Sequence, residues 1–169
     1  MPVMINNLFS RSKYYRTGHI DMQNARFLEH ERRFAAERRI KYRGTASVNL
    51  EVLHFACEKD EANVARLKNF FRKNGCDRLD IQNHLPAVID QEQLDAAIRL
   101  SETSAEALMG HPRDDYTKLN FPPNFRLECL HGLHRVQAAA EFLPLGDKRW
   151  IVDLYLAGRK FPFRMRSRL

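Results

Sequence analysis

The sequence predicts an α/β domain, and three observations lead to that class. The 169 residues are enough for one domain and leave little room for a second. The apolar fraction of 44% and the charged fraction of 29% are close to globular averages, so the chain is expected to fold around a core. Short stretches with strand-like alternation are separated by stretches with helical periodicity, which is the order of an α/β fold.

The first expected element is a basic helix over about residues 21–41. This stretch is rich in Glu, Arg and Ala and contains neither Gly nor Pro, while its apolar residues fall only loosely on one side. Such a pattern is typical of an amphipathic arm, and Gly44 is expected to end it. Residues 1–45 are therefore assigned to a basic arm in front of a domain of residues 46–157. Four arginines recur at about helical spacing: Arg32, Arg33, Arg38 and Arg39.

The domain is expected to open with a strand at residues 48–54, where apolar and polar side chains alternate. A helix should follow, because Asp60 is a good N-terminal cap and Gly75 stands where a left-handed residue would end it. The apolar positions of this helix follow a three-to-four spacing: Val64, Leu67, Phe70 and Phe71.

A second apolar run at residues 85–89 carries Pro86 at its start and is therefore predicted to be a short or edge strand. A helix over about residues 91–100 comes next. Residues 101–124 contain several prolines and few large apolar side chains, which predicts an inserted loop with a functional or mobile character. The inward-facing residues of the helix are expected to be Leu94, Ala97, Ile98 and Leu100.

A third strand is predicted at residues 125–129, where apolar and polar residues alternate again. It runs through a turn at Gly132 into a helix over residues 134–143. The last strand is expected at residues 150–156, and residues 158–169 form a basic tail. The four strands and the helices between them complete the α/β order.

The turn before the last helix has the features of a phosphate site. The first backbone N–H groups of a helix have no partners inside it, and the helix dipole adds positive potential there. Gly132 would let a phosphate approach the backbone, Arg135 could grip two of its oxygens, and His131 could face the ligand. The alternative is a structural turn, with His134 as a cap and Arg135 paired to a carboxylate.

The same turn resembles the ParB/sulfiredoxin-like fold, in which a strand ends in Gly-x-x-Arg before an alanine-rich helix. The motif reads Gly-Glu-Arg-Arg in ParB, Gly-Cys-His-Arg in sulfiredoxin and Gly-Leu-His-Arg at residues 132–135 here. The wider run Cys-Leu-His-Gly-x-His-Arg from Cys129 looks closer still to an uncharacterised fungal protein family. This resemblance covers roughly residues 17–157. Further segments carry it: Glu61 to Leu67, Gly75 to Leu79, Asn83 to Asp90 and Trp150 to Tyr155.

The resemblance implies a small mixed sheet with helices, an α+β arrangement, and a nucleotide phosphate held at the turn. By resemblance, Gly132, His134 and Arg135 are the phosphate contacts, with His131 beside them. It also implies that the ligand is a nucleoside triphosphate with magnesium, and that the activity, where there is one, is hydrolysis or phosphoryl transfer. The particular nucleotide and substrate stay open.

The chain departs from these relatives at important positions. The catalytic cysteine of sulfiredoxin aligns with Leu133, which excludes that chemistry by that route, and His134 replaces the second arginine of ParB. A base for phosphoryl transfer would have to come from Asp60 or Glu61. The alternative for Glu61 is structural, because an acidic residue in the first turn complements the helix dipole.

No metal site is expected from the sequence. Cys129, His131 and His134 have suitable identities, but zinc needs four ligands, or three and a water, and no Cys-x-x-Cys pair is present. Cys129 is instead expected to be a buried thiol on its strand, and His134 a turn residue.

Two further polar residues have simple interpretations. Asp153 lies in the last apolar strand, where an unpaired carboxylate is costly to bury, so it should face solvent or pair with an arginine such as Arg135. His84 precedes Pro86 and is expected in a loop.

The charge of the chain suggests a second class of function. The net charge is +7, with ten Lys/Arg against four Asp/Glu in residues 10–43 and five against none in residues 158–169. Basic flanks attract polyanions without sequence specificity. The alternative function is therefore a non-enzymatic module that binds nucleic acid or a protein through its flanks. Another alternative is a truncated, inactive member of the family.

Composition also bears on location. No apolar run approaches the roughly 18 residues that span a bilayer, and no secretory signal is visible at the start. The three cysteines are far apart in the sequence, which argues against a disulfide framework. The sequence therefore predicts an intracellular protein, nuclear or cytoplasmic, without a membrane partner. It does not predict an oligomeric state.

Overall fold

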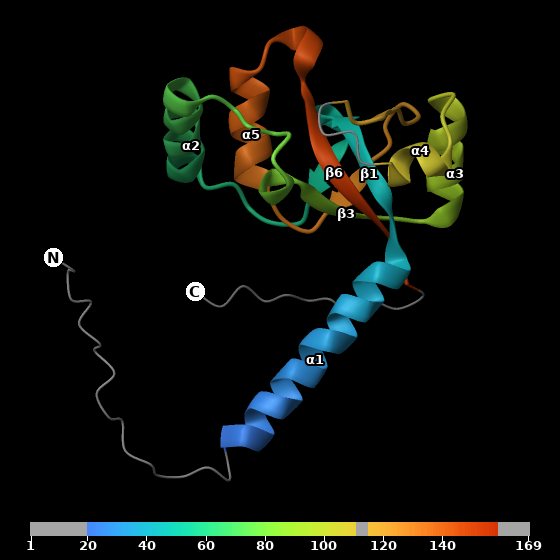
Figure 1. Cartoon of the computed structure of the whole chain (residues 1–169). Helices are drawn as coiled ribbons and strands as arrows, with labels where there is room; N and C mark the ends of the chain where they lie inside the picture. Colours follow the sequence, from blue (N-terminus) through green and yellow to red (C-terminus); the bar gives the residue numbers. More distant parts are fainter. Residues whose placement is uncertain (1–19, 111–114, 159–169) are drawn as a thin grey trace, which may run out of the picture. The chain divides into compact units, whose positions relative to one another are not determined.

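The computed structural model describes residues 20–110 and 115–158, and Figure 1 shows the whole chain. Contacts divide the chain into two units, with the boundary between Glu37 and Arg38. Helix α1 spans Ile20–Lys41, which confirms the predicted basic N-terminal helix. It ends three residues before Gly44, and the first strand begins immediately after it. The predicted tail lies outside the described residues from position 159 onward.

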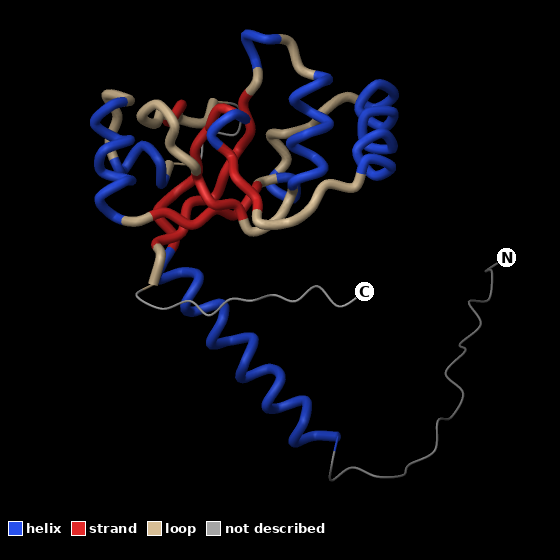
Figure 2. The backbone as a smooth tube through the Cα atoms, turned by 180° about the vertical axis from the view of Figure 1, so that it is seen from behind, coloured by secondary structure: helices blue, strands red, loops and turns tan. Residues whose placement is uncertain are grey.

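The fold class is confirmed: the described residues form a six-stranded mixed sheet with helices. The strand order is β2-β5-β3-β6-β1-β4. The β1–β6 and β3–β5 pairs are antiparallel, and the β1–β4, β2–β5 and β3–β6 pairs are parallel. In Figures 1 and 2 the strands lie between two groups of helices, α2 with α5 and α3 with α4. The strands are β1 Tyr42–Asn49, β2 Leu53–Phe55, β3 Leu85–Ile89, β4 Lys118–Leu119, β5 Leu127–Cys129 and β6 Arg149–Leu156.

The helices of the domain agree closely with the sequence predictions. Asp60 caps α2 as expected, because its Oδ1 accepts hydrogen bonds from the backbone N–H groups of Ala62 and Asn63. Gly75 ends α2 with φ +81°. The expectation that Leu100 faces inward is wrong, since it is 53% exposed. The helices are α2 Glu61–Asn74, α3 Gln91–Leu100, α4 Ala105–Met109 and α5 Leu133–Phe142, with 3-10 turns η1 Leu50–Val52, η2 Ile81–Asn83 and η3 Leu145–Asp147.

The predicted strand at residues 48–54 is wrong at both ends. β1 starts six residues earlier, at Tyr42, and stops at Asn49. Asn49 Oδ1 accepts the backbone N–H of Glu51 at 3.1 Å, and this local bond turns the chain into η1 before β2 begins. A side chain that bonds its own backbone two residues on competes with a sheet ladder, and this competition cuts the alternating run in two.

The predicted bounds of β3 are correct, but its expected position at an edge is wrong. β3 lies inside the sheet between β5 and β6. Its pairing with β5 is confined to Ala87 and Val88, so the missing N–H of Pro86 falls beside the paired stretch and removes no bond from it. The carbonyl oxygen of Pro86 still accepts the N–H of Leu130 at 2.9 Å.

Residues 101–124 are more than an inserted loop, because they contain α4 and β4. Leu108 of α4 and Leu119 of β4 are fully buried, and Ser47 N–H donates to the carbonyl oxygen of Thr117 at 2.9 Å. This segment supplies the strand beyond β1 and packs α4 against β1. Gly44 in β1 has φ +120°, and a Cβ placed there would overlap the Leu108 backbone.

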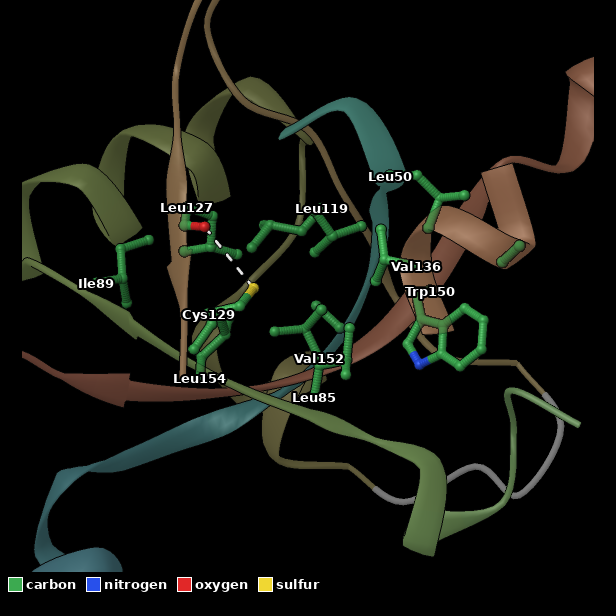
Figure 3. Packing of buried hydrophobic residues seen from close by; sticks show 14 of the residues in the cluster. Leu50, Leu85, Ile89, Leu119, Leu127, Cys129, Val136, Trp150, Val152 and Leu154 are labelled. Carbon is green, nitrogen blue, oxygen red and sulfur yellow. Dashed lines mark hydrogen bonds between the residues drawn. The ribbon is translucent and has the colours of Figure 1, made fainter. Parts of the chain in front are cut away.

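The core forms where the inward residues of the strands meet the helices. Strand alternation places Ala46 and Val48 of β1 on the same side as Trp150, Val152 and Leu154 of β6. All five are at most 1% exposed. Figure 3 shows this cluster, with α5 contributing Val136 and the sheet contributing further side chains: Leu85, Leu127 and Cys129. Within the described residues, no helix combines the length and the apolar character needed to cross a membrane.

A partly buried polar network on the opposite side of the sheet joins β1, β6 and the residue just before β3. Asp153 Oδ1 accepts the hydroxyl of Thr45 at 2.6 Å and lies 3.1 Å from His84 Nδ1. Tyr42 and Thr45 share a hydroxyl–hydroxyl bond of 2.7 Å. Because Thr45 gives its proton to Asp153, Tyr42 must be the donor in that bond. The expectation for Asp153 is therefore wrong, because its carboxylate contacts Thr45 and His84 and pairs with no arginine among the described residues. The expectation for His84 is correct, since it lies between η2 and β3 outside any helix or strand, although its side chain is only 4% exposed.

Substitution of Gly44 by Ala is expected to destabilise the domain by at least about 2 kcal/mol, since the new Cβ meets backbone and φ is positive. Gly75→Ala is the matched control, because its φ of +81° is also unfavourable but no atom lies within 4 Å of the added Cβ. The control should lose less than Gly44→Ala, because it carries only the cost of its backbone conformation at φ +81° and ψ +168°, about 1–3 kcal/mol, and no steric overlap. Urea unfolding followed by the fluorescence of the single tryptophan measures both. Equal losses would contradict the steric argument.

Asp153→Asn is expected to cost about 1.5–3 kcal/mol of unfolding free energy, because it weakens two bonds to a charged acceptor. Asp147→Asn is the comparison, since Asp147 pairs with Arg78 while its side chain is 51% exposed. A pair at the surface should cost less than about 1 kcal/mol. The same unfolding measurement distinguishes the two positions, and a smaller loss at Asp153 than at Asp147 would refute the importance of the network.

Candidate functional site

The turn before α5 has a structural explanation of its own. β5 ends at Cys129, and Gly132 adopts φ +105° and ψ +7° before α5 begins. A Cβ on Gly132 would overlap Cδ2 of Leu85 in β3. This contact concerns only the space that a Cβ would occupy, so the approach of a phosphate to the backbone at Gly132 stays a prediction. The glycine is needed for the left-handed backbone and for the close packing of the turn on β3.

The N-terminus of α5 has no capping side chain among the described residues. The first N–H group bonded within the helix is that of Val136, which donates to the carbonyl oxygen of Gly132 at 3.1 Å. The N–H groups of the preceding turn therefore have no intrahelical acceptor. The alternative in which His134 caps α5 is wrong, because its side chain bonds elsewhere. This helix end keeps the positive potential that an anion would neutralise.

Arg135 is held at this helix end by neutral oxygen atoms. Its Nη1 lies 3.3 Å from Oδ1 and 3.4 Å from the carbonyl oxygen of Asn83. Asn83 is fixed in turn, because its carbonyl oxygen accepts the indole N–H of Trp150 at 2.8 Å and its amide donates to Asp77 O at 2.7 Å. No carboxylate in the described residues pairs with Arg135, so the alternative of a carboxylate partner is also wrong. The guanidinium is positioned without being neutralised.

His134 joins the first turns of α5 and α2. Its Nε2 accepts the backbone N–H of Asp60 at 3.0 Å, so the ring proton of this histidine is on Nδ1. Of the predicted site residues, Asp60 and Glu61 are thereby brought beside the turn. Both carboxylates are already engaged: Asp60 caps α2, and Glu61 pairs with Lys59 at 2.6 Å.

His131 lies on the exposed side of the turn. Desolvation of its ring lowers the pKa of His131, and the charge of Arg135 lowers it further. The imidazole is therefore expected to be neutral at pH 7, which leaves Arg135 and the end of α5 as the sources of positive charge at the turn. An anion at the turn would face the guanidinium of Arg135 and a neutral His131 ring.

The thiols and carboxylates around the turn do not assemble into a metal centre. Burial raises the pKa of Cys129 to about 12, so this thiol stays protonated. Across the part of the chain that the structure describes, no three His, Cys, Asp or Glu side chains gather where they could hold a metal ion. Asp60 and Glu61 each have one partner as placed, since Oδ1 of Asp60 caps α2 and Glu61 pairs with Lys59.

Other polar features of the domain were not expected from the sequence. The network of Tyr42, Thr45, His84 and Asp153 joins residues up to 108 positions apart. The one available signal was a carboxylate in an apolar strand, which indicates a partner without naming it. A shallow groove of about 410 Å³ lies elsewhere, and no predicted site residue lines it. Its walls are Ser101, Glu102, Thr103, Asp115, Tyr116, Thr117 and Lys118.

Comparison with known proteins places the domain in a family. None of the curated proteins and none of the solved structures matches the chain. Residues 41–167 match the family described as protein of unknown function (DUF3723) N-terminal domain. The match begins at the last residue of α1 and includes the whole sheet together with α2 to α5. Because it covers most of the sequence, the chain belongs to the DUF3723 N-terminal domain family.

Proposed function

We propose that this domain binds a phosphate-bearing ligand at the first turn of α5, a site formed by residues 132–135 and named here the α5 anion site. One observation carries the proposal: the guanidinium of Arg135 is anchored by Asn83 at a helix N-terminus that no side chain caps among the described residues. Two sources of positive potential thus point to one place, and neither has an anionic partner there. Helix N-termini and arginine are the groups that proteins use for phosphate.

The chemical class of the ligand follows from the groups at the turn. Backbone N–H donors and a guanidinium recognise the oxygens of a phosphate group, and Arg135 can offer two parallel bonds to them. Nδ1 of His134 is a further donor, because Nε2 is occupied by Asp60 N–H. The resemblance to the ParB/sulfiredoxin-like fold supports a nucleoside triphosphate as the form in which the phosphate arrives.

Catalysis is not part of this proposal. Hydrolysis or phosphoryl transfer requires a base near the phosphate, and Asp60 and Glu61 are the nearest candidates. The carboxylate of Asp60 accepts two backbone N–H groups, and that of Glu61 is paired with Lys59. The site therefore supports binding better than it supports a reaction.

A second proposed function is electrostatic binding of nucleic acid by α1. The four arginines of the predicted basic arm are all exposed, and Lys41 follows them in the last turn. The family match starts at residue 41, so these arginines lie outside the matched range. Exposed arginines neutralise phosphates whatever the base sequence.

Arg135→Ala is expected to abolish the rise in melting temperature that a bound nucleotide produces. A ligand at a hundred times its dissociation constant stabilises by about 2.7 kcal/mol, which shifts the melting temperature by several degrees. Thermal shift with ATP, GTP, CTP, their diphosphates and inorganic phosphate, with and without magnesium, measures this. Arg66→Ala is the matched control, because Arg66 also bonds an asparagine side chain but lies outside the site. The absence of any shift in a folded wild-type sample would reject the α5 anion site.

Replacement of Arg32, Arg33, Arg38 and Arg39 by Ala is expected to weaken binding of a single-stranded oligonucleotide and to flatten its salt dependence. Each lost phosphate contact should reduce the slope of log K against log salt by about 0.7. Fluorescence anisotropy over a salt series gives the slope, with Arg66→Ala, which lies outside α1 and the α5 anion site, as the control that leaves it unchanged. An unchanged slope in the fourfold variant would exclude α1 as the binding element.

A further inference from the structure

Large apolar side chains are exposed where α2 and α5 end together. Phe70 of α2 is 55% exposed and Phe142 of α5 is 38% exposed. The buried ring of Phe71 connects them, with ring centroids 6.4 Å from Phe70 and 5.8 Å from Phe142. The two helices pack side by side, as Figures 1 and 2 show. An aromatic row therefore crosses from one helix to the other and is partly open to solvent.

The apolar surface continues beyond α5. Leu145 in η3, three residues after Phe142, is 88% exposed. Arg78 fixes this turn, because it pairs with the Asp147 carboxylate and donates to the Asp147 carbonyl oxygen at 2.6 Å. Leu79, which follows Arg78 in the sequence, is 42% exposed. Phe70, Leu79, Phe142 and Leu145 are named here the α2/α5 patch.

The exposed apolar side chains of the α2/α5 patch need an explanation, because they lie on helices and on a turn that hydrogen bonds hold in place. Single exposed apolar residues are normal, but several large ones exposed near the same ends of two packed helices indicate a surface that another molecule covers. Phe and Leu side chains on neighbouring helices form the kind of surface that accepts the apolar face of a helix. Leu145 in particular projects from a turn that two bonds to Arg78 hold in place.

The basic residues of α2 near the patch favour an acidic partner. After Glu61, every ionisable residue of α2 is basic. Lys68 pairs with Glu141, and Arg72 hydrogen-bonds the neutral side chain of Asn69 while its charge also acts on the Glu141 carboxylate. One carboxylate therefore serves two cations, and positive charge remains. Lys73 follows Arg72 in the last turn of α2. A second copy of this chain would bring the same cations together, whereas a partner with carboxylates would neutralise them.

From these observations we propose that the α2/α5 patch binds an acidic amphipathic helix of a protein partner. The apolar face of that helix covers Phe70, Phe142 and Leu145, and its carboxylates lie toward Arg72 and Lys73. The patch is at the C-terminal ends of α2 and α5, and the α5 anion site is at the N-terminal end of α5. This inference is therefore independent of the proposed phosphate site.

The test uses two labelled helical peptides of about 18 residues, with Leu at positions i, i+4 and i+7 of each repeat. One peptide carries Glu on its polar positions, and the other carries Lys there. Fluorescence anisotropy with the full chain is expected to show binding of the Glu peptide, about tenfold or more tighter than the Lys peptide. Equal binding of both peptides, or no binding of the Glu peptide, would overturn the proposal.

Variants locate the binding. Phe70→Ser with Phe142→Ser is expected to weaken the Glu peptide at least about tenfold, and Arg72→Glu with Lys73→Glu to weaken it and reduce its salt dependence. Leu100→Ser is the matched control, because Leu100 is 53% exposed on α3. Unfolding curves check that each variant is folded. Sedimentation that shows a dimer, lost in the double phenylalanine variant, would replace the proposed partner by a second copy.

Discussion

The carbonyl oxygen of Asn83 connects the core of this domain to its candidate site. It accepts the indole N–H of the buried Trp150 and lies within reach of the Arg135 guanidinium. Trp150 is the largest side chain that is fully buried, so its single donor must find an acceptor inside the fold. That requirement fixes Asn83 at the end of η2, and Asn83 then decides where the charge of Arg135 lies relative to α5.

Local signals allowed the helices to be predicted well. Asp60 and Gly75 mark the ends of α2 through bonds and backbone angles that involve only neighbouring residues. β1 was predicted poorly because its first half depends on pairing with β6, more than a hundred residues away. Its sequence there includes Gly44 and Thr45, which show no apolar alternation. The edge position predicted for β3 was wrong for the same reason. Pro86 is a local signal, whereas the order of strands in the sheet depends on residues far apart in the sequence.

The candidate site shows the same division. The sequence identified the turn, its glycine and Arg135, because a strand followed by glycine and a helix is a local pattern. It could not identify Asn83, which is 52 positions from Arg135, nor the bond between His134 and Asp60 across 74 positions. Those two contacts decide that Arg135 stays uncompensated and that His134 serves the junction of two helices.

The contact between Gly132 and Leu85 has a consequence for reading the relatives of this chain. Because packing alone requires a glycine there, selection for a stable fold would retain it in members that bind no ligand at all. The presence of that glycine in a relative therefore indicates a shared fold and not a shared ligand. Arginine at position 135 together with asparagine at position 83 is the combination whose gain or loss would trace the history of an anion-binding function.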